Sequence, residues 1–213
     1  MFSCAVNLLP GHRELWELGY EHTDPSLGNL IVISKGQGVL NDWDLCRVRD
    51  RVARTSYHQE RNGTIPFMAL DLLTDEYWNG DVKRLYRHDL EALIWILPWV
   101  FLQYEGQRLS SKPVFERWNS CDYIAVQDSK RSYLNKLRSG GKPKECWKEE
   151  WRFACLLLSW LRHRETARLD SVGPFVQQPV EDAPLEEATY NDFRTQVEDA
   201  MEVYPPLHSM SIF

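Results

Sequence analysis

The sequence has no apolar run long enough to cross a bilayer, and it shows no signal peptide. Its most apolar stretch, Leu90 to Leu102, is shorter than the roughly 20 residues that a spanning helix needs, and Pro98 interrupts it. We therefore expect no membrane association and an intracellular location, either cytoplasmic or nuclear.

Paired cysteines are also missing. The five cysteines are odd in number and widely spaced, and they never form a Cys-x-x-Cys motif. This pattern argues against a disulfide framework and against a zinc site, and it predicts reduced thiols. The cysteines are Cys4, Cys46, Cys121, Cys146 and Cys155.

An excess of positive charge is missing as well. The chain has 25 Lys and Arg against 31 Asp and Glu, which gives a net charge of −6. A nucleic-acid-binding surface usually requires a basic excess, so we expect no nucleic-acid partner. The arginines in the polar stretch 46–64 fit a solvated loop better than a nucleic-acid patch.

The composition is that of an ordinary globular protein, with 43% hydrophobic residues and nine Trp in 213 residues. Apolar residues that recur every three or four positions predict helices, and short apolar runs joined by a turn predict a hairpin. The expected elements are helices near 5–20, 88–104, 147–164 and 185–203, and a hairpin of strands 29–33 and 38–43.

Helix 88–104 is apolar nearly all round, so we expect it to be buried on all sides, with a kink or a break at Pro98. The fold class that follows is mainly α, a helical lobe around this helix with one small β-hairpin. We expect one domain over residues 1–165. Residues 166–213 then form a Pro-rich linker and an acidic C-terminal helix.

The strongest chemical signal is the segment His22-Thr23-Asp24-Pro25-Ser26-Leu27-Gly28-Asn29. Phosphoryl transfer needs a carboxylate that orients the attacking hydroxyl and oxygen ligands that hold Mg²⁺. Asp24 and Asn29 offer both functions on one loop. A second carboxylate, Asp42, stands at the end of the expected hairpin.

Two further segments follow in an order that resembles protein kinases. The run Gly63-Thr64-Ile65-Pro66-Phe67-Met68-Ala69-Leu70-Asp71 is similar to the segment that closes a kinase activation loop, and His88-Asp89-Leu90-Glu91 opens the buried helix. Together with Asp42-Trp43-Asp44-Leu45, they resemble the fungal-type protein kinase family. The resemblance covers about residues 5–165 and is densest from 22 to 104, and it implies the C-terminal lobe of a kinase.

The resemblance implies a role for each matching residue. Asp24 would be the catalytic base, and Thr64 would hydrogen-bond it near the substrate hydroxyl. Ser26 stands where many Ser/Thr kinases have a lysine that touches the transferred phosphate, and this family also has Ser there. Asn29 and Asp42 would bind Mg²⁺ and, through it, ATP. His22 and Asp89 would brace the loop.

The sequence departs from a complete kinase in two places. The 21 residues before His22 contain no lysine and no glycine-rich loop, so we expect the N-terminal lobe to be missing and this chain alone to bind Mg²⁺ and ATP weakly or not at all. Thr23 replaces an arginine that pairs with a phosphate on the activation loop. Control by phosphorylation of that loop is therefore not expected.

The implied function is ATP-dependent phosphorylation of Ser or Thr in a protein substrate, impaired in this chain. A non-catalytic interaction module remains an alternative, with self-association or a protein partner on the surface that would face the missing lobe. A small-molecule phosphotransferase also shows the His-x-Asp and Asn pattern. The segment 62–73 argues against this alternative, because small-molecule phosphotransferases lack the segment that closes a kinase activation loop.

Overall fold

The computed structural model describes residues 2–34, 37–49, 63–137, 141–171 and 183–203. These residues are mostly helical, which confirms the predicted fold class at that level. The helices are α1 (Phe2–Glu17), α2 (Asp75–Trp78), α3 (Tyr86–Gln103), α4 (Tyr123–Asn135), α5 (Glu150–Ser171) and α6 (Ala183–Val203). Short 3₁₀ turns lie between them, at Trp43–Leu45, Ile65–Phe67, Leu70–Leu73, Glu116–Asn119 and Glu145–Trp147.

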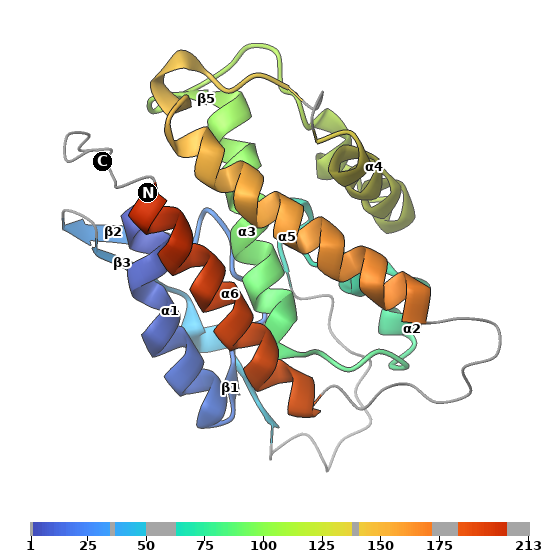
Figure 1. Cartoon of the computed structure of the whole chain (residues 1–213). Coiled ribbons are helices and arrows are strands. Elements are labelled where there is room, and N and C mark those ends of the chain that lie inside the picture. Colours follow the sequence, from blue (N-terminus) through green and yellow to red (C-terminus); the bar gives the residue numbers. More distant parts are fainter. Residues whose placement is uncertain (1, 35–36, 50–62, 138–140, 172–182, 204–213) are drawn as a thin grey trace.

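Helix α3 forms the centre of the molecule, as the sequence predicted. Its Ile94, Trp95 and Phe101 are fully buried, and α5 and α6 pack against it (Figure 1). The helix continues through Pro98, so the predicted break does not occur there. Burial of this apolar helix stabilises the fold, because removal of apolar area from water is the dominant favourable term in folding.

The predicted hairpin is present. Strands β2 (Leu30–Ser34) and β3 (Gln37–Leu40) pair antiparallel, with Leu30 opposite Leu40 and Ile31 opposite Val39. Helix α1 packs against β3. Leu40 is buried, whereas Ile31 and Val39 are exposed, so one face of the hairpin packs on the body and the other faces solvent.

A second strand pair was not predicted. Strand β1 (Tyr20–Glu21) pairs antiparallel with β4 (Arg47–Val48), inside the stretch that the sequence indicated as loop. The Glu21 carboxylate is fully buried, and its Oε2 lies 3.1 Å from Nε of Arg47. Glu21 and Arg47 occupy opposite positions of the two strands, so this contact joins the strands side chain to side chain. A third short pair joins β5 (Tyr104–Glu105) to β6 (Arg108–Leu109).

The C-terminal helices pack against the same core as the rest of the chain. Helix α5 begins at Glu150 and extends to Ser171, and α6 packs against both α5 and α3 through Phe193, Val197 and Ala200. The division of the chain at residue 165 stays a prediction, and the proposed linker 173–184 falls mostly outside the described residues. No described helix combines the length and the apolar character that crossing a membrane requires.

Candidate active site

His22 fixes the loop that follows β1. Its Nε2 donates to the carbonyl of Asn41 at 2.7 Å, and its Nδ1 accepts from the backbone N–H of Asp24 at 3.2 Å. The ring is buried and meets Trp43 edge to face, with 4.6 Å between centroids. Burial lowers the pKa of His22, which keeps the ring neutral and lets Nδ1 act as an acceptor. His22 therefore ties the Asp24 loop to the end of the β2–β3 hairpin.

The two segments that His22 joins both carry backbone strain. Thr23 has a φ of 71° and Asp42 a φ of 67°, and among the described non-glycine residues only these two have positive φ. A β-branched residue such as Thr is particularly unfavourable in this left-handed region. Strained residues of this kind concentrate at functional sites, where the surrounding structure holds them in place.

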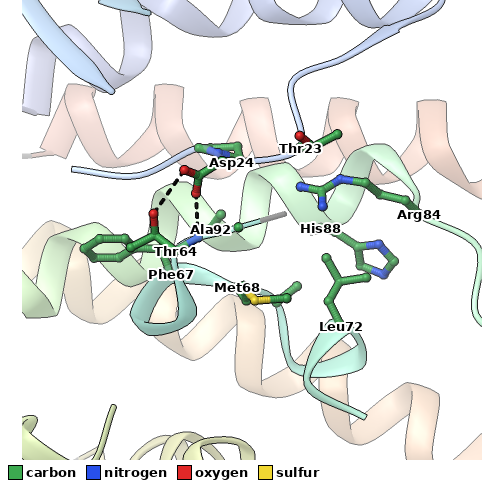
Figure 2. A pocket seen from close by; sticks show the side chains of 12 residues that line it. Thr23, Asp24, Thr64, Phe67, Met68, Leu72, Arg84, His88 and Ala92 are labelled. Carbon is green, nitrogen blue, oxygen red and sulfur yellow. Dashed lines mark hydrogen bonds between the residues drawn. The ribbon is translucent and has the colours of Figure 1, made fainter. Parts of the chain in front are cut away.

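Asp24 is the meeting point of the site (Figure 2). Its Oδ1 accepts the backbone N–H of Thr64 at 2.6 Å, and its Oδ2 accepts the Thr64 hydroxyl at 3.0 Å. Asn29 Nδ2 donates to the Asp24 carbonyl at 3.0 Å and to Oδ2 at 3.3 Å. The structure thus brings together Asp24, Asn29 and Thr64, three of the residues that the sequence singled out.

The carboxylate of Asp24 keeps capacity for one more donor. An ionised carboxylate has about four lone-pair sites, and Thr64 and Asn29 occupy three of them. Asp24 is half-buried, so the remaining site is not sealed from solvent. A hydroxyl that approached Asp24 could donate its proton there while the other three bonds held the carboxylate in one orientation.

The side chains of Asn29 and Asp42 fit the chemistry of a magnesium site. Because Asn29 points its Nδ2 at Asp24, its Oδ1 faces the other way, and that oxygen has no hydrogen bond to the described residues. The Asp42 side chain is exposed and has no hydrogen bond or ion pair there either. The backbone bond from Asn41 N to Asn29 O, 2.7 Å, joins the two segments.

Carboxylate and amide oxygens are the ligands that Mg²⁺ prefers, and it usually takes only one or two carboxylates from the protein. The described residues contain no cluster of three or more His, Cys, Asp or Glu side chains that could hold a metal ion. Asn29 and Asp42 would therefore be the protein ligands, with other oxygens completing the coordination.

Ser26 is buried in the turn between Asp24 and Asn29. Its carbonyl accepts the backbone N–H of Asn29 at 3.2 Å. The residue therefore shapes the turn between Asp24 and Asn29. Its contact with a transferred phosphate stays a prediction.

A small pocket opens beneath Asp24, between the loop and α3 (Figure 2). Its empty space is about 190 Å³, including the part open to solvent. This is below the roughly 300–1,000 Å³ of typical small-molecule sites, so the pocket does not accommodate a nucleotide. Its walls include Thr23, Thr64, Met68, Arg84 and His88.

Asp89 braces the site differently from the expectation. Its Oδ1 accepts from Nη2 of Arg84 at 2.5 Å, and its Oδ2 lies 3.2 Å from Nε2 of His12, whereas the resemblance implied that Asp89 would brace the catalytic loop itself. Burial alone would raise the pKa of Asp89, but the charge of Arg84 and the bonds from His12 and Arg84 hold it well below its usual range. Sequence reasoning missed both partners, because neither lies in a recognisable motif.

The stretch 46–64 is only partly described, because residues 50–62 lie outside the described residues. The expectation that phosphorylation of this loop exerts no control therefore stays a prediction. Thr23 itself is buried, and its hydroxyl donates to the carbonyl of Leu45 at 3.5 Å.

A comparison with protein-family models matches residues 1–101 to the family described as fungal protein kinase. This range includes Asp24, Asn29, Asp42, Thr64 and Asp89, and it confirms the family named from the sequence. A search of curated proteins gave no significant match. Residues 1–101, a little under half of the chain, are therefore similar to the fungal protein kinase family.

Proposed function

We propose that this site transfers the γ-phosphoryl group of ATP to a Ser or Thr hydroxyl of a protein, with Asp24 as the base. The observation that supports this most directly is the pair of hydrogen bonds from Thr64 to both carboxylate oxygens of Asp24. Catalysis of phosphoryl transfer depends chiefly on positioning and on charge stabilisation. A carboxylate held at both oxygens, with one acceptor position left, suits that task.

Each residue then has a defined role. Asp24 accepts the proton of the substrate hydroxyl as its oxygen attacks the γ-phosphorus, the bond to the β–γ bridging oxygen breaks, and ADP leaves. Thr64 and Asn29 hold the Asp24 carboxylate, and His22 holds the loop. Asn29 Oδ1 and Asp42 would bind Mg²⁺, which when bound neutralises charge on the phosphates.

Binding of ATP in a complete kinase uses a glycine-rich loop and a lysine. Residues 1–21 contain neither, and the first lysine of the chain is Lys35. The test therefore joins the nucleotide-binding lobe of a complete family member ahead of residue 5 and measures radiolabel transfer to a generic protein substrate. We expect transfer to Ser or Thr, and we expect Asp24→Asn to lower turnover by roughly a hundredfold or more, the scale of removing a positioned base.

The matched control is Asp128→Asn, the same change at an exposed position on α4. It should leave turnover unchanged. Activity that survives Asp24→Asn would refute the assignment of the base. A folded fusion protein without any activity would favour the second candidate function.

That second candidate is a non-catalytic module that binds a protein. The observation that favours it is the solvent-facing side of the β2–β3 hairpin, where Ile31 is 43% exposed, Ile33 65% and Val39 39%. Apolar side chains gathered on one surface mark interfaces more often than chance. A small-molecule phosphotransferase is the least supported alternative, because it does not account for the Thr64 segment that closes on Asp24.

A further inference from the structure

The backbone from Met68 to Leu70 is held by buried side chains of two helices. The Met68 carbonyl accepts from Lys130 Nζ at 2.6 Å, and the Leu70 carbonyl accepts from Gln127 Nε2 at 2.8 Å. On the other side, the Leu70 N–H donates to Glu91 Oε1 of α3 at 2.8 Å. Lys130 and Gln127, three residues apart on α4, are here called the α4 clamp.

Lys130 is an unusual residue for a purely structural position. It is fully buried, and its Nζ lies 4.9 Å from the ring centre of Trp95 and 5.4 Å from that of Trp118. Burial of an amine carries a large desolvation cost, which an apolar side chain of similar length would avoid. The bond to Met68 is the specific interaction that an apolar side chain could not provide.

The clamp connects to Asp24 through an unbroken series of hydrogen bonds. The N–H groups of Phe67 and Met68 both donate to the Thr64 carbonyl, at 2.8 and 3.2 Å. Thr64 in turn donates from its own N–H and its hydroxyl to Asp24. The position of Met68 therefore fixes the 3₁₀ turn Ile65–Phe67, and that turn fixes Thr64 against the carboxylate.

We propose that Lys130 and Gln127 are positioning residues, which hold the Met68–Leu70 backbone so that Thr64 keeps the Asp24 carboxylate oriented. The consequence for turnover rests on the proposed function, whereas the consequence for the Thr64–Asp24 hydrogen bonds does not. The clamp lies beyond residue 101, where the family match ends, so a helix outside the matched region, α4, would then control the geometry of the site.

The test measures amide hydrogen exchange by NMR on the whole 213-residue chain. Lys130→Met keeps an apolar side chain between the two Trp rings and removes the donor to Met68. We expect the amides of Thr64 and Met68 to exchange on the order of tenfold faster, the scale of losing one hydrogen bond. The amide of Ile94, in the centre of α3, should be unchanged. Lys130→Gln, which retains an N–H donor, should restore part of the protection.

A destabilised control separates positioning from general loss of stability. Leu134→Ala removes a buried side chain from the same helix without touching the clamp, so it should speed the slowest amides together, Ile94 included, with no selective effect at Thr64. Gln127→Met provides a second test if Lys130→Met does not fold, and it should speed exchange at Leu70 and Thr64. Exchange at Thr64 that matches the wild type in a folded clamp variant would overturn the proposal.

A measurement of kinase activity distinguishes failure of the clamp proposal from failure of the proposed function. In the fusion protein that carries a nucleotide-binding lobe, Lys130→Met should lower kcat and leave KM for ATP unchanged, because α4 does not reach the metal ligands. Faster exchange at Thr64 in a fusion without any activity, wild type included, would count against the proposed function and support the clamp. A lower kcat with unchanged exchange at Thr64 would overturn the clamp.

Discussion

Thr64 donates two hydrogen bonds to Asp24 across 40 residues of sequence, one to each carboxylate oxygen. The bond from the backbone N–H does not depend on the side chain at position 64. The bond from the hydroxyl does, because it needs the side chain of a Thr or a Ser. A carboxylate bound in this way cannot rotate without breaking a bond, so its free acceptor position points in one direction. Substitutions at Thr64 are therefore the simplest test of whether the Asp24 carboxylate is held in one orientation.

The first prediction concerns the Thr64 hydroxyl. Thr64→Val keeps the shape and the backbone bond but removes the donor to Oδ2, so we expect the unfolding free energy to fall by about 1.5–3 kcal/mol, the scale of a hydrogen bond to a charged group. Urea denaturation of the whole chain measures this loss. Thr64→Ser keeps the hydroxyl and should cost less. Equal stability of the Val variant and the wild type would mean that the hydroxyl bond contributes nothing.

The second prediction concerns nucleotide binding by the chain as it stands. Asn29 and Asp42 supply metal ligands, but the pocket beneath Asp24 is small and no lysine precedes Lys35. We expect Mg²⁺·ATP to bind with a Kd in the millimolar range or weaker, about −4 kcal/mol at most. Calorimetry on the purified chain tests this. A micromolar Kd would contradict it, and a loss of that binding in Asp42→Asn would then locate the metal.

The sequence was sufficient to predict the parts of the site that are local. His22, Asp24 and Asn29 lie on one short loop, and Asp42 ends a hairpin whose two short apolar runs and turn are visible in the residues. The closure of Thr64 on Asp24 could be predicted from the family pattern, although the two are distant in sequence. The central helix followed from its apolar character on every side.

The supporting residues could not be predicted, for a physical reason. Lys130 stands in a polar stretch and looks like a surface lysine until Trp95 and Trp118 pack around it. His12, on α1, and Arg84, just before α3, acquire their role only when the fold brings both to Asp89. Strand β4 is two residues long, too short for any periodicity, and its Arg47 lies opposite the buried Glu21 of β1. Each of these depends on tertiary contacts that leave no spacing signal.

The third prediction concerns self-association. Ile31 and Val39 face each other across the β2–β3 hairpin on its exposed side, opposite the pair Leu30 and Leu40 that packs inward. We expect the isolated chain to form dimers or larger species through this face, because association removes the apolar side chains from water. Sedimentation velocity over a concentration series measures this.

A double variant, Ile31→Thr with Val39→Thr, keeps residues that suit a strand and should shift the chain toward monomer. The control is Val114→Thr, the same kind of change at an exposed Val outside the hairpin, and it should leave the distribution unaltered. A wild-type chain that stays monomeric at every concentration would count against this surface as an interface.

The last prediction concerns the pH dependence of stability at Lys130. Burial lowers the pKa of Lys130 from its usual 10.5 to about 7, and the nearby charge of Glu91 only partly opposes this. Between pH 7 and 10.5 the unfolded chain therefore binds a proton that the folded chain does not. Stability rises with pH wherever the unfolded state binds more protons, so the cost of burying Lys130, fully present below pH 7, is relieved as pH rises toward 10.5.

The measurement is the unfolding free energy of the wild type minus that of Lys130→Met from pH 6 to pH 10. The difference should increase with pH above 7, by at most about 1.4 kcal/mol per pH unit, because one proton is involved. Subtraction cancels the groups that titrate independently of Lys130. A flat difference would mean that Lys130 keeps its charge in the folded state, so that Glu91 and the Trp rings compensate for its burial. The bond to Met68 would then be the bond of an ammonium group throughout that range.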